Sequence, residues 1–269
     1  MPPSEAAGCP VAAPRSGPAA RPRAIIFDVD GTLAETEELH RLAFNGAFRE
    51  FGLDWDWSPD LYRRLLKVTG GKERLAHYIA AHTPSRGAEM LERVAELHAA
   101  KTARYTALVE TGPTVLRPGI ARLIREARAE GVAVALATTT SPENVAALLR
   151  AAGREVEKAV GVIAAGDMVA RKKPAPDVYH LALRMLELEA EECLAVEDSA
   201  AGVAAARAAG LPVLVTCSSY TDPGPLEGTL CALSDLGEAD APCRRIGGSA
   251  AADGPMVTLA TIRRWMAAA

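Results

Sequence analysis

Two aspartates stand two positions apart, directly after a short apolar segment near the start of the chain. The segment is Ala24-Ile25-Ile26-Phe27, and Asp28-Val29-Asp30-Gly31-Thr32 follows it. In an extended segment, side chains two positions apart project to the same side, so both carboxylates could meet a cation and a phosphoryl group together. A DxDGT sequence also fits a loop whose aspartates cap backbone amides. Polar groups elsewhere in the chain must therefore decide between the two interpretations.

Three further polar sites follow other short apolar segments. Thr138 follows 134–137, Lys173 stands in the KKPAPD loop beyond 160–163, and Glu197-Asp198 follows 194–196. Taken singly, Lys173 also fits a solvated loop lysine, and Glu197-Asp198 also fits the N-terminal cap of a helix beginning near Ser199. The carboxyl ends of strands in a parallel sheet line one crevice, where all four sites would converge. This coincidence favours a magnesium and phosphate site.

The residue types suggest which chemical role each group would have in such a site. Carboxylate oxygens suit Mg²⁺, which keeps several waters and takes one or two protein carboxylates plus substrate phosphate. Lys173 could neutralise the charge of a phosphoryl group, and the Thr138 hydroxyl could hydrogen-bond one of its oxygens. A carboxylate oxygen is then available to attack phosphorus in line.

Alternating strands and helices are expected through most of the chain. A doubly wound parallel sheet, a Rossmann-like α/β core, follows from strand-helix-strand crossovers that cover both sheet faces. The expected strands are 24–27, 132–137, 160–163, 193–196 and 213–215, and the expected helices are 119–130, 143–152, 175–188, 200–209 and 258–267.

The stretch from Thr36 to about Val115 contains helical patterns and no convincing strand, which predicts a helical cap domain inserted after the first strand. The expected domains are a disordered extension at 1–22, a core at 23–35 and 116–269, and a cap at 36–115. Four cap helices are expected at 37–51, 59–67, 72–82 and 86–110. Residues 222–255 are rich in Gly, Pro and Asp, and we assign them no function.

Composition excludes several classes of protein. The net charge is −4 without a basic face, which argues against a nucleic-acid partner. No apolar stretch approaches the roughly 18 residues of a membrane span. Five cysteines form no CxxC pair, as expected of reduced cytoplasmic thiols. The N-terminal extension weakly resembles a plastid transit peptide, but its prolines oppose the required helix. We expect a cytoplasmic monomer.

Longer motifs carry a resemblance to a known family. FDVDGT (27–32), Thr138, Lys173 and VEDS (196–199) resemble the haloacid-dehalogenase superfamily, over residues 24 to about 221. Within it, FDVDGTLAETEELHR, TGGKER, TTTSPENV and KKPAPDVY resemble the CbbY-like branch. The resemblance implies a phosphatase that hydrolyses xylulose 1,5-bisphosphate, an inhibitor of Rubisco in the Calvin cycle. Alternatives are hydrolysis of phosphoglycolate or another sugar phosphate, transfer as in β-phosphoglucomutase, and a sugar-phosphate-binding regulatory protein.

The resemblance also implies roles for the core residues. Asp28 would be the nucleophile that forms an aspartyl-phosphate, and Asp30 would be the general acid and base. Thr138 and Lys173 would hold the transferring phosphoryl group. Thr32 favours hydrolysis over transfer. The predicted Mg²⁺ ligands are Asp28, Asp30 through its backbone carbonyl, Asp198, and Glu197 as a ligand or a supporting partner.

A bisphosphate requires a second anion anchor, which the cap must supply. Glycines at a helix start followed by Lys72 could bind an anion, although a tight turn between two cap helices also explains them. The resemblance places Glu37 and His40 near substrate hydroxyls and Asp30; alternatively they are a surface Glu and a half-buried His. Trp55 and Trp57 are interpreted as cap core, and His98 as an ordinary helix residue. The predicted substrate-binding residues are Glu37, His40, Tyr62, Gly70, Gly71, Lys72, Arg74 and Thr139.

Overall fold

The core is a seven-stranded sheet in a computed structural model that describes residues 22–112, 116–250 and 254–268. The predicted extension at 1–22 lies almost entirely outside the described residues. The strand order is β3-β2-β1-β4-β5-β6-β7; all neighbours pair in parallel except β6 and β7, which are antiparallel. The strands are β1 (Ala24–Phe27), β2 (Ala133–Thr138), β3 (Val160–Ala165), β4 (Cys193–Glu197), β5 (Val213–Thr216), β6 (Cys231–Leu233) and β7 (Arg245–Gly247).

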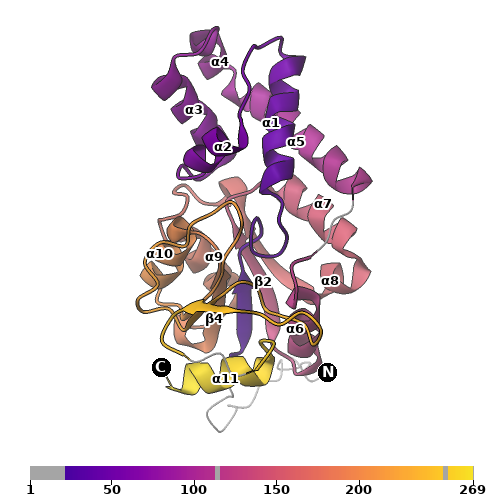
Figure 1. The fold of residues 1–269 in the computed structure, drawn as a ribbon, viewed down its shortest axis with the longest axis vertical. Helices are drawn as coiled ribbons and strands as arrows, with labels where there is room; N and C mark the ends of the chain where they lie inside the picture. The colour runs from indigo at the N-terminus through magenta and orange to yellow at the C-terminus, as the bar shows by residue number, and fades with distance from the viewer. Residues whose placement is uncertain (1–21, 113–115, 251–253, 269) are drawn as a thin grey trace, which may run out of the picture.

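Helices cover both faces of this sheet, so the doubly wound α/β fold is confirmed (Figure 1). Side chains of β1 alternate between the faces: Ile25 and Phe27 join one hydrophobic cluster, and Ala24 and Ile26 join the other. The first cluster contains α6 (Ile120–Ala129), α7 (Pro142–Ala152), α8 (Arg154–Ala159) and α11 (Leu259–Ala268); the second contains α9 (Asp177–Leu186) and α10 (Ala200–Ala208).

Five further helices lie together above the sheet in Figure 1. Their shared hydrophobic cluster is largely aromatic, and Trp57 stands at its centre with ring centroids 4.6 Å from Phe44 and 5.1 Å from Phe48. Trp55 and Trp57 are both buried there, as expected of core residues. The helices are α1 (Glu37–Glu50), α2 (Pro59–Leu65), α3 (Gly71–His82), α4 (Gly87–Glu92) and α5 (Val94–Thr111).

The structure corrects the expected elements at three places. The helix expected at 86–110 is two helices, because Arg93 leaves the helical conformation between α4 and α5. A short helix, α8, precedes β3. Residues 222–255 contribute β6 and β7, which extend the sheet beyond the five expected strands. Each of these strands has three residues, which is too short for an alternating hydrophobic pattern to show.

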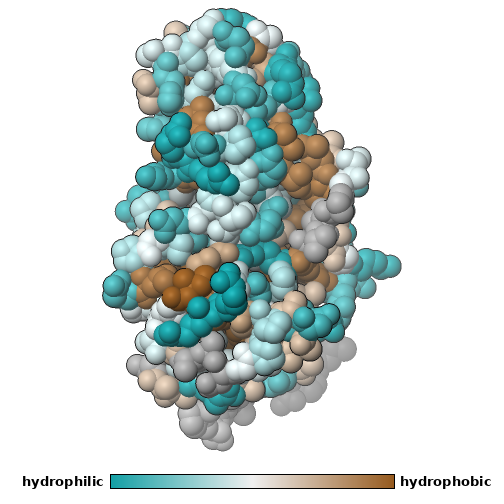
Figure 2. Space-filling view, viewed as in Figure 1, coloured by the Kyte–Doolittle hydropathy of each residue, from teal (hydrophilic) through white to brown (hydrophobic). Residues whose placement is uncertain are grey.

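The surface is mixed in character. Figure 2 shows hydrophilic side chains over most of the face in view, interrupted by separated hydrophobic patches. Among the described residues, no helix has both the length and the apolar character to cross a membrane.

Candidate active site

A cavity of about 1060 Å³ lies where the carboxyl ends of the strands meet the helices above the sheet. Of the predicted site residues, only Tyr62 and Glu197 are absent from its lining. The predicted residues that line it are Asp28, Asp30, Glu37, His40, Gly70, Gly71, Lys72, Arg74, Thr138, Thr139, Lys173 and Asp198. Residues from four strand ends and from the cap region thus share one space.

Lys173 stands at the centre of a buried ionic cluster. Its Nζ donates to Asp28 Oδ1 at 2.6 Å, to Glu197 Oε1 at 2.6 Å and to the carbonyl of Ala137 at 2.8 Å. All three donors of the ammonium are therefore used. Tyr179 also donates to Glu197 Oε1, at 2.5 Å. The cluster fixes Lys173 beside Asp28.

Three carboxylates of this cluster could hold a metal ion. Oxygens of Asp28, Glu197 and Asp198 all lie within 4.8 Å of one another. Burial and the negative charge of Glu197 outweigh Lys173 and raise the pKa of Asp28 to about 8. Burial and the charges of Asp28 and Glu197 raise the pKa of Asp198 as well. With all three carboxylates ionised, one ammonium would leave two negative charges uncompensated, so the residues fit one divalent cation with a preference for oxygen ligands.

Small residues make room for these carboxylates. A Cβ added to Gly202 in α10 would lie 1.9 Å from Glu197 Oε2, and one added to Gly31 would lie 2.2 Å from Asp198 Oδ2. Gly31 also has a φ of +86°, which disfavours other residues. Ser199 caps α10 by accepting a hydrogen bond from Gly202 N at 3.2 Å. Glu197 and Asp198 are therefore free of the capping role that the sequence also allowed.

Asp30 lies in a second polar network that reaches into α5. His40 Nε2 lies 2.9 Å from Asp30 Oδ1, and His40 Nδ1 lies 2.5 Å from Nζ of Lys101. Thr36 donates to the same oxygen of Asp30 at 2.5 Å. Burial alone would raise the pKa of Asp30, but the charge and hydrogen bond of His40, with Thr36 and Lys101, lower it to about 2. Asp30 is ionised at neutral pH in this state.

The protonation of His40 and Lys101 follows from their surroundings. Burial lowers the pKa of His40, and the positive charge of Lys101 lowers it further. At neutral pH a neutral His40 can donate from Nε2 to Asp30 and accept at Nδ1 from Lys101; the imidazole carries its charge only at acid pH, where Asp30 titrates. Burial also lowers the pKa of Lys101 to about 7. The ring of Tyr105 stacks on His40 with centroids 4.0 Å apart, which holds the imidazole in place.

Glu37 connects the cavity to two of the other predicted substrate-binding residues. Tyr62 donates its hydroxyl to Glu37 Oε2 at 2.8 Å, and Arg74 Nη1 donates to the Tyr62 hydroxyl at 3.3 Å. Arg74 Nε also bonds the carbonyls of Leu65 and Val68. Tyr62 thus contacts two residues that line the cavity, Glu37 and Arg74, without lining it itself.

The two glycines at the start of α3 have packing reasons that do not require an anion. Gly70 has a φ of +88°, and its Cβ would lie 2.1 Å from Glu73 Oε2. A Cβ on Gly71 would lie 2.3 Å from Nε2 of His98. Lys72 is partly exposed at the cavity wall, and its Nζ lies 2.6 Å from Asp167 Oδ2. Anion binding by this segment remains a prediction.

Comparisons with known proteins agree with this geometry. Residues 22–210 match the haloacid dehalogenase-like hydrolase family. The chain belongs to this family. It is 48% identical over 247 residues to the plasmid-encoded CbbY protein of Cupriavidus necator. This match covers 90% of this chain and 96% of the Cupriavidus necator protein. CbbY of Cereibacter sphaeroides is 53% identical over 74% of this chain and 85% of its own length.

A solved structure shares both fold and sequence with this CbbY-like chain. It is a CbbY variant from Rhodobacter sphaeroides in complex with xylulose-1,5-bisphosphate, with a TM-score of 0.72 and 48% identity. The match covers 79% of this chain and 94% of that one. The chain is thus an enzyme, a CbbY-like phosphatase.

The structure of this CbbY-like hydrolase also reveals cavity residues that sequence reasoning missed. Lys101 and His98 line the cavity from α5, and Asn144 lines it from α7. His98 was interpreted as an ordinary helix residue; its contact with Gly71 was the signal that only the structure supplies. Asn144 is buried, and its Oδ1 has no hydrogen-bond partner in the structure.

Proposed function

We propose that this phosphatase is Mg²⁺-dependent and converts xylulose 1,5-bisphosphate to xylulose 5-phosphate through an aspartyl-phosphate on Asp28. The observation that carries the proposal is the placement of Asp28 beside Lys173 and the other carboxylates in the lining of a large cavity. The bisphosphate bound by the CbbY structure from Rhodobacter sphaeroides supports this choice of substrate.

The first step transfers the phosphoryl group to the protein. Lys173 holds Oδ1 of Asp28, so Oδ2 is the oxygen that attacks phosphorus. The bond from phosphorus to Asp28 Oδ2 forms as the bond to the sugar oxygen breaks, and Asp30 gives its proton to that oxygen. The Thr138 hydroxyl and Lys173 stabilise the phosphoryl oxygens as negative charge is redistributed.

The second step releases phosphate. Asp30 accepts a proton from water, whose oxygen attacks phosphorus and regenerates the Asp28 carboxylate. Asp30 must be protonated for the first step although its pKa is about 2 in this state. A dianionic phosphoryl group beside Asp30 raises that pKa, because a like charge disfavours the ionised carboxyl.

We assign direct contact with Mg²⁺ to the carboxylates of Asp28 and Asp198, which belong to one acidic cluster, and to the Asp30 carbonyl, as the family resemblance implies. The ion supplies charge neutralisation for the attacking carboxylate and the phosphoryl oxygens. Glu197 has both oxygens engaged, Oε1 by Lys173 and Tyr179 and Oε2 by the Asp198 amide at 3.3 Å. We assign Glu197 a supporting role, in which it positions Lys173 and Asp198.

Phosphate release from a panel of sugar mono- and bisphosphates tests the proposed function. We expect release with Mg²⁺ to be fastest for xylulose 1,5-bisphosphate, and EDTA to abolish it until excess Mg²⁺ is returned. Xylulose 5-phosphate should accumulate as the product. Faster release from a monophosphate such as phosphoglycolate would contradict the proposed substrate, and activity that survives EDTA would contradict the metal requirement.

Lys72→Ala should weaken binding of a bisphosphate selectively. Lys72 lines the cavity and forms an ion pair with Asp167 at 2.6 Å, so a substrate phosphate can replace that carboxylate. A charge-assisted hydrogen bond is worth about 1.5–3 kcal/mol, which predicts a KM for the bisphosphate raised by roughly 10- to 100-fold. The KM for a monophosphate should change little.

Lys67→Ala is the matched control, because Lys67 is an exposed lysine of the same region that does not line the cavity. Its KM values should equal those of the wild type. An equal increase in KM for mono- and bisphosphates in Lys72→Ala would show that Lys72 does not anchor the second phosphate.

A further inference from the structure

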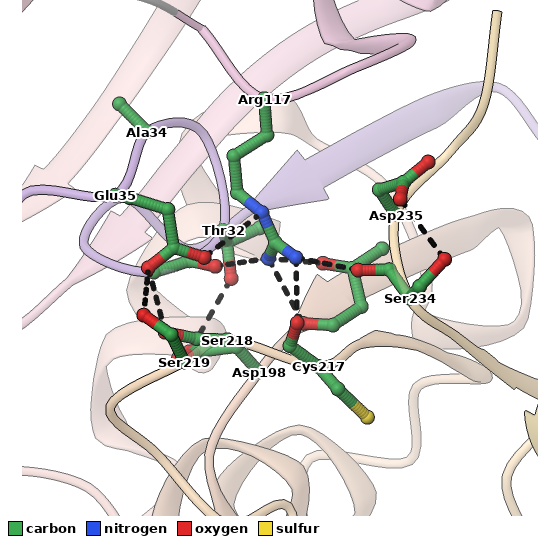
Figure 3. Close-up of polar contacts among 12 residues, drawn as sticks. Thr32, Ala34, Glu35, Arg117, Asp198, Cys217, Ser218, Ser219, Ser234 and Asp235 are labelled. Atoms are coloured by element: carbon green, nitrogen blue, oxygen red, sulfur yellow. Dashed lines mark hydrogen bonds and ion pairs between the residues drawn. The ribbon is translucent and has the colours of Figure 1, made fainter. Parts of the chain in front are cut away.

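Arg117 occupies the point at which the chain returns from the helices above the sheet to the core. Leu116 forms an antiparallel bridge with Ala34, and Arg117 N donates to the Leu33 carbonyl at 2.8 Å. The returning segment thus lies against the segment that leaves β1 and carries Asp28 and Asp30. Figure 3 shows the Arg117 side chain between these two segments and the loops that follow β5 and β6.

The guanidinium group of Arg117 donates mainly to backbone carbonyls. Its Nη1 donates to the carbonyls of Gly31 and Thr216 and to the Thr216 hydroxyl, and Nη2 donates to the carbonyls of Cys217 and Ser234, each at 2.6 Å. Arg117 is only 8% exposed. One side chain therefore connects the loop Asp28–Thr32, called the catalytic loop below, to the ends of β5 and β6.

Glu35 completes this arrangement from the catalytic-loop side. Its Oε1 lies 3.3 Å from Nε of Arg117, and its Oε2 accepts a hydrogen bond from Ser218 at 2.9 Å (Figure 3). The same loop after β5 is thus held twice, directly by Arg117 and through Glu35. Among the described residues, those that Arg117 contacts do not line the large cavity, and neither does Arg117 itself.

The Gly31 carbonyl is the contact with consequences for chemistry. Gly31 follows Asp30 directly, has a left-handed φ of +86°, and packs so closely on Asp198 that a Cβ would collide with its carboxylate. The next residue, Thr32, donates to Asp198 Oδ1 at 3.4 Å. A fixed Gly31 carbonyl limits rotation of the adjoining peptides, and so fixes Asp30 relative to Asp198.

We propose that Arg117 is a positioning residue, which holds the Asp28–Thr32 loop in the geometry that aligns Asp28, Asp30 and Asp198 for phosphoryl transfer. This inference rests on the proposed phosphatase function. A bidentate, five-donor guanidinium is required, because lysine cannot span four carbonyls on three segments. Arg117 touches no substrate, so its loss should act on kcat and leave KM nearly unchanged.

Arg117→Ala tests the proposal, with Arg122→Ala as the matched control. Arg122 is also largely buried and donates to the carbonyls of Val257, Leu236 and Gly237, far in sequence from the catalytic loop. Misplacing reacting groups by about 1 Å can cost roughly 100-fold, so we expect kcat of Arg117→Ala to fall by about 10- to 100-fold. Arg122→Ala should keep the wild-type kcat at temperatures at which both variants are folded.

Chemical rescue separates positioning from general loss of structure. A second cavity of about 620 Å³ is lined by Arg117, Cys217 and Ser234 and shares no residue with the lining of the first. Guanidinium ion at millimolar concentration can therefore enter the space left in Arg117→Ala without entering the active site. It should restore much of kcat, whereas tetramethylammonium at equal ionic strength should not. Arg117→Lys should remain impaired.

Hydrogen exchange at the amides of residues 30–34 gives a readout that needs no turnover. Exchange should be faster in Arg117→Ala than in the wild type and in Arg122→Ala. Wild-type exchange in Arg117→Ala, equal losses of kcat in the two alanine variants, or failure of guanidinium to rescue would each overturn the proposal. If the wild type releases no phosphate from any sugar phosphate, the proposed function fails, while exchange still decides whether Arg117 positions the loop.

Discussion

Asp28→Asn should remove phosphatase turnover while the fold is retained. The amide cannot act as a nucleophile toward phosphorus, and loss of a catalytic nucleophile lowers kcat by about four orders of magnitude or more. Burial and Glu197 raise the pKa of Asp28 to about 8, so folding without metal at neutral pH requires proton uptake at this carboxyl, a cost that an amide of equal size avoids. The melting temperature should equal or exceed that of the wild type without metal.

Two measurements check this outcome. Phosphate release with saturating substrate gives kcat, and circular dichroism gives the melting temperature. Full activity in Asp28→Asn would exclude a covalent intermediate on this residue. If Asp28→Asn lost both activity and folding, Asp28→Glu would test the role of the residue instead. This variant keeps a carboxylate but displaces it from Lys173, and it should also be inactive.

Asp30→Asn should impair both steps, with a kcat for sugar phosphates lowered by roughly 10²- to 10⁴-fold. The asparagine can neither protonate the leaving sugar oxygen nor accept a proton from water. An aryl phosphate such as p-nitrophenyl phosphate separates the two roles, because its leaving group needs no proton. In Asp30→Asn this substrate should give a burst of nitrophenol that is stoichiometric with enzyme, followed by slow turnover.

Asp28→Asn is the matched control, since it cannot form the covalent intermediate and should show no burst. Stopped-flow absorbance at the nitrophenolate wavelength makes the measurement. A wild-type rate of sugar-phosphate hydrolysis in Asp30→Asn would show that another group carries the proton. A burst of equal size in both variants would place the intermediate on some residue other than Asp28.

The central part of the site was accessible from the sequence because it depends on local patterns. Asp28 and Asp198 directly follow short buried strands, Thr138 is the last residue of another, and parallel strands end at one edge of a sheet. Lys173 follows β3 less closely but stands in a distinctive loop. Because the strands are parallel neighbours, their carboxyl ends place these residues at one edge of the sheet.

The rest depends on contacts that no sequence pattern encodes. Lys101 reaches His40 across 61 positions, and Tyr105 stacks on the same ring because α5 packs beside α1. Arg117 forms its bonds with segments up to 117 positions away. Gly70 and Gly71 fit an anion site by sequence, yet in the structure a Cβ added to either would collide with a nearby side chain. Tertiary packing, which local spacing does not determine, sets all of these contacts.

Trapping the phosphoryl group on Asp28 tests the central claim most directly. Wild-type enzyme and Asp30→Asn would be mixed with p-nitrophenyl phosphate and Mg²⁺, quenched in acid within the burst phase, digested and examined by mass spectrometry. The account predicts one added phosphoryl group on the peptide that contains Asp28, most abundant in Asp30→Asn and absent from Asp28→Asn. A burst of product without phosphorylation of that peptide, or with phosphorylation elsewhere, would contradict it.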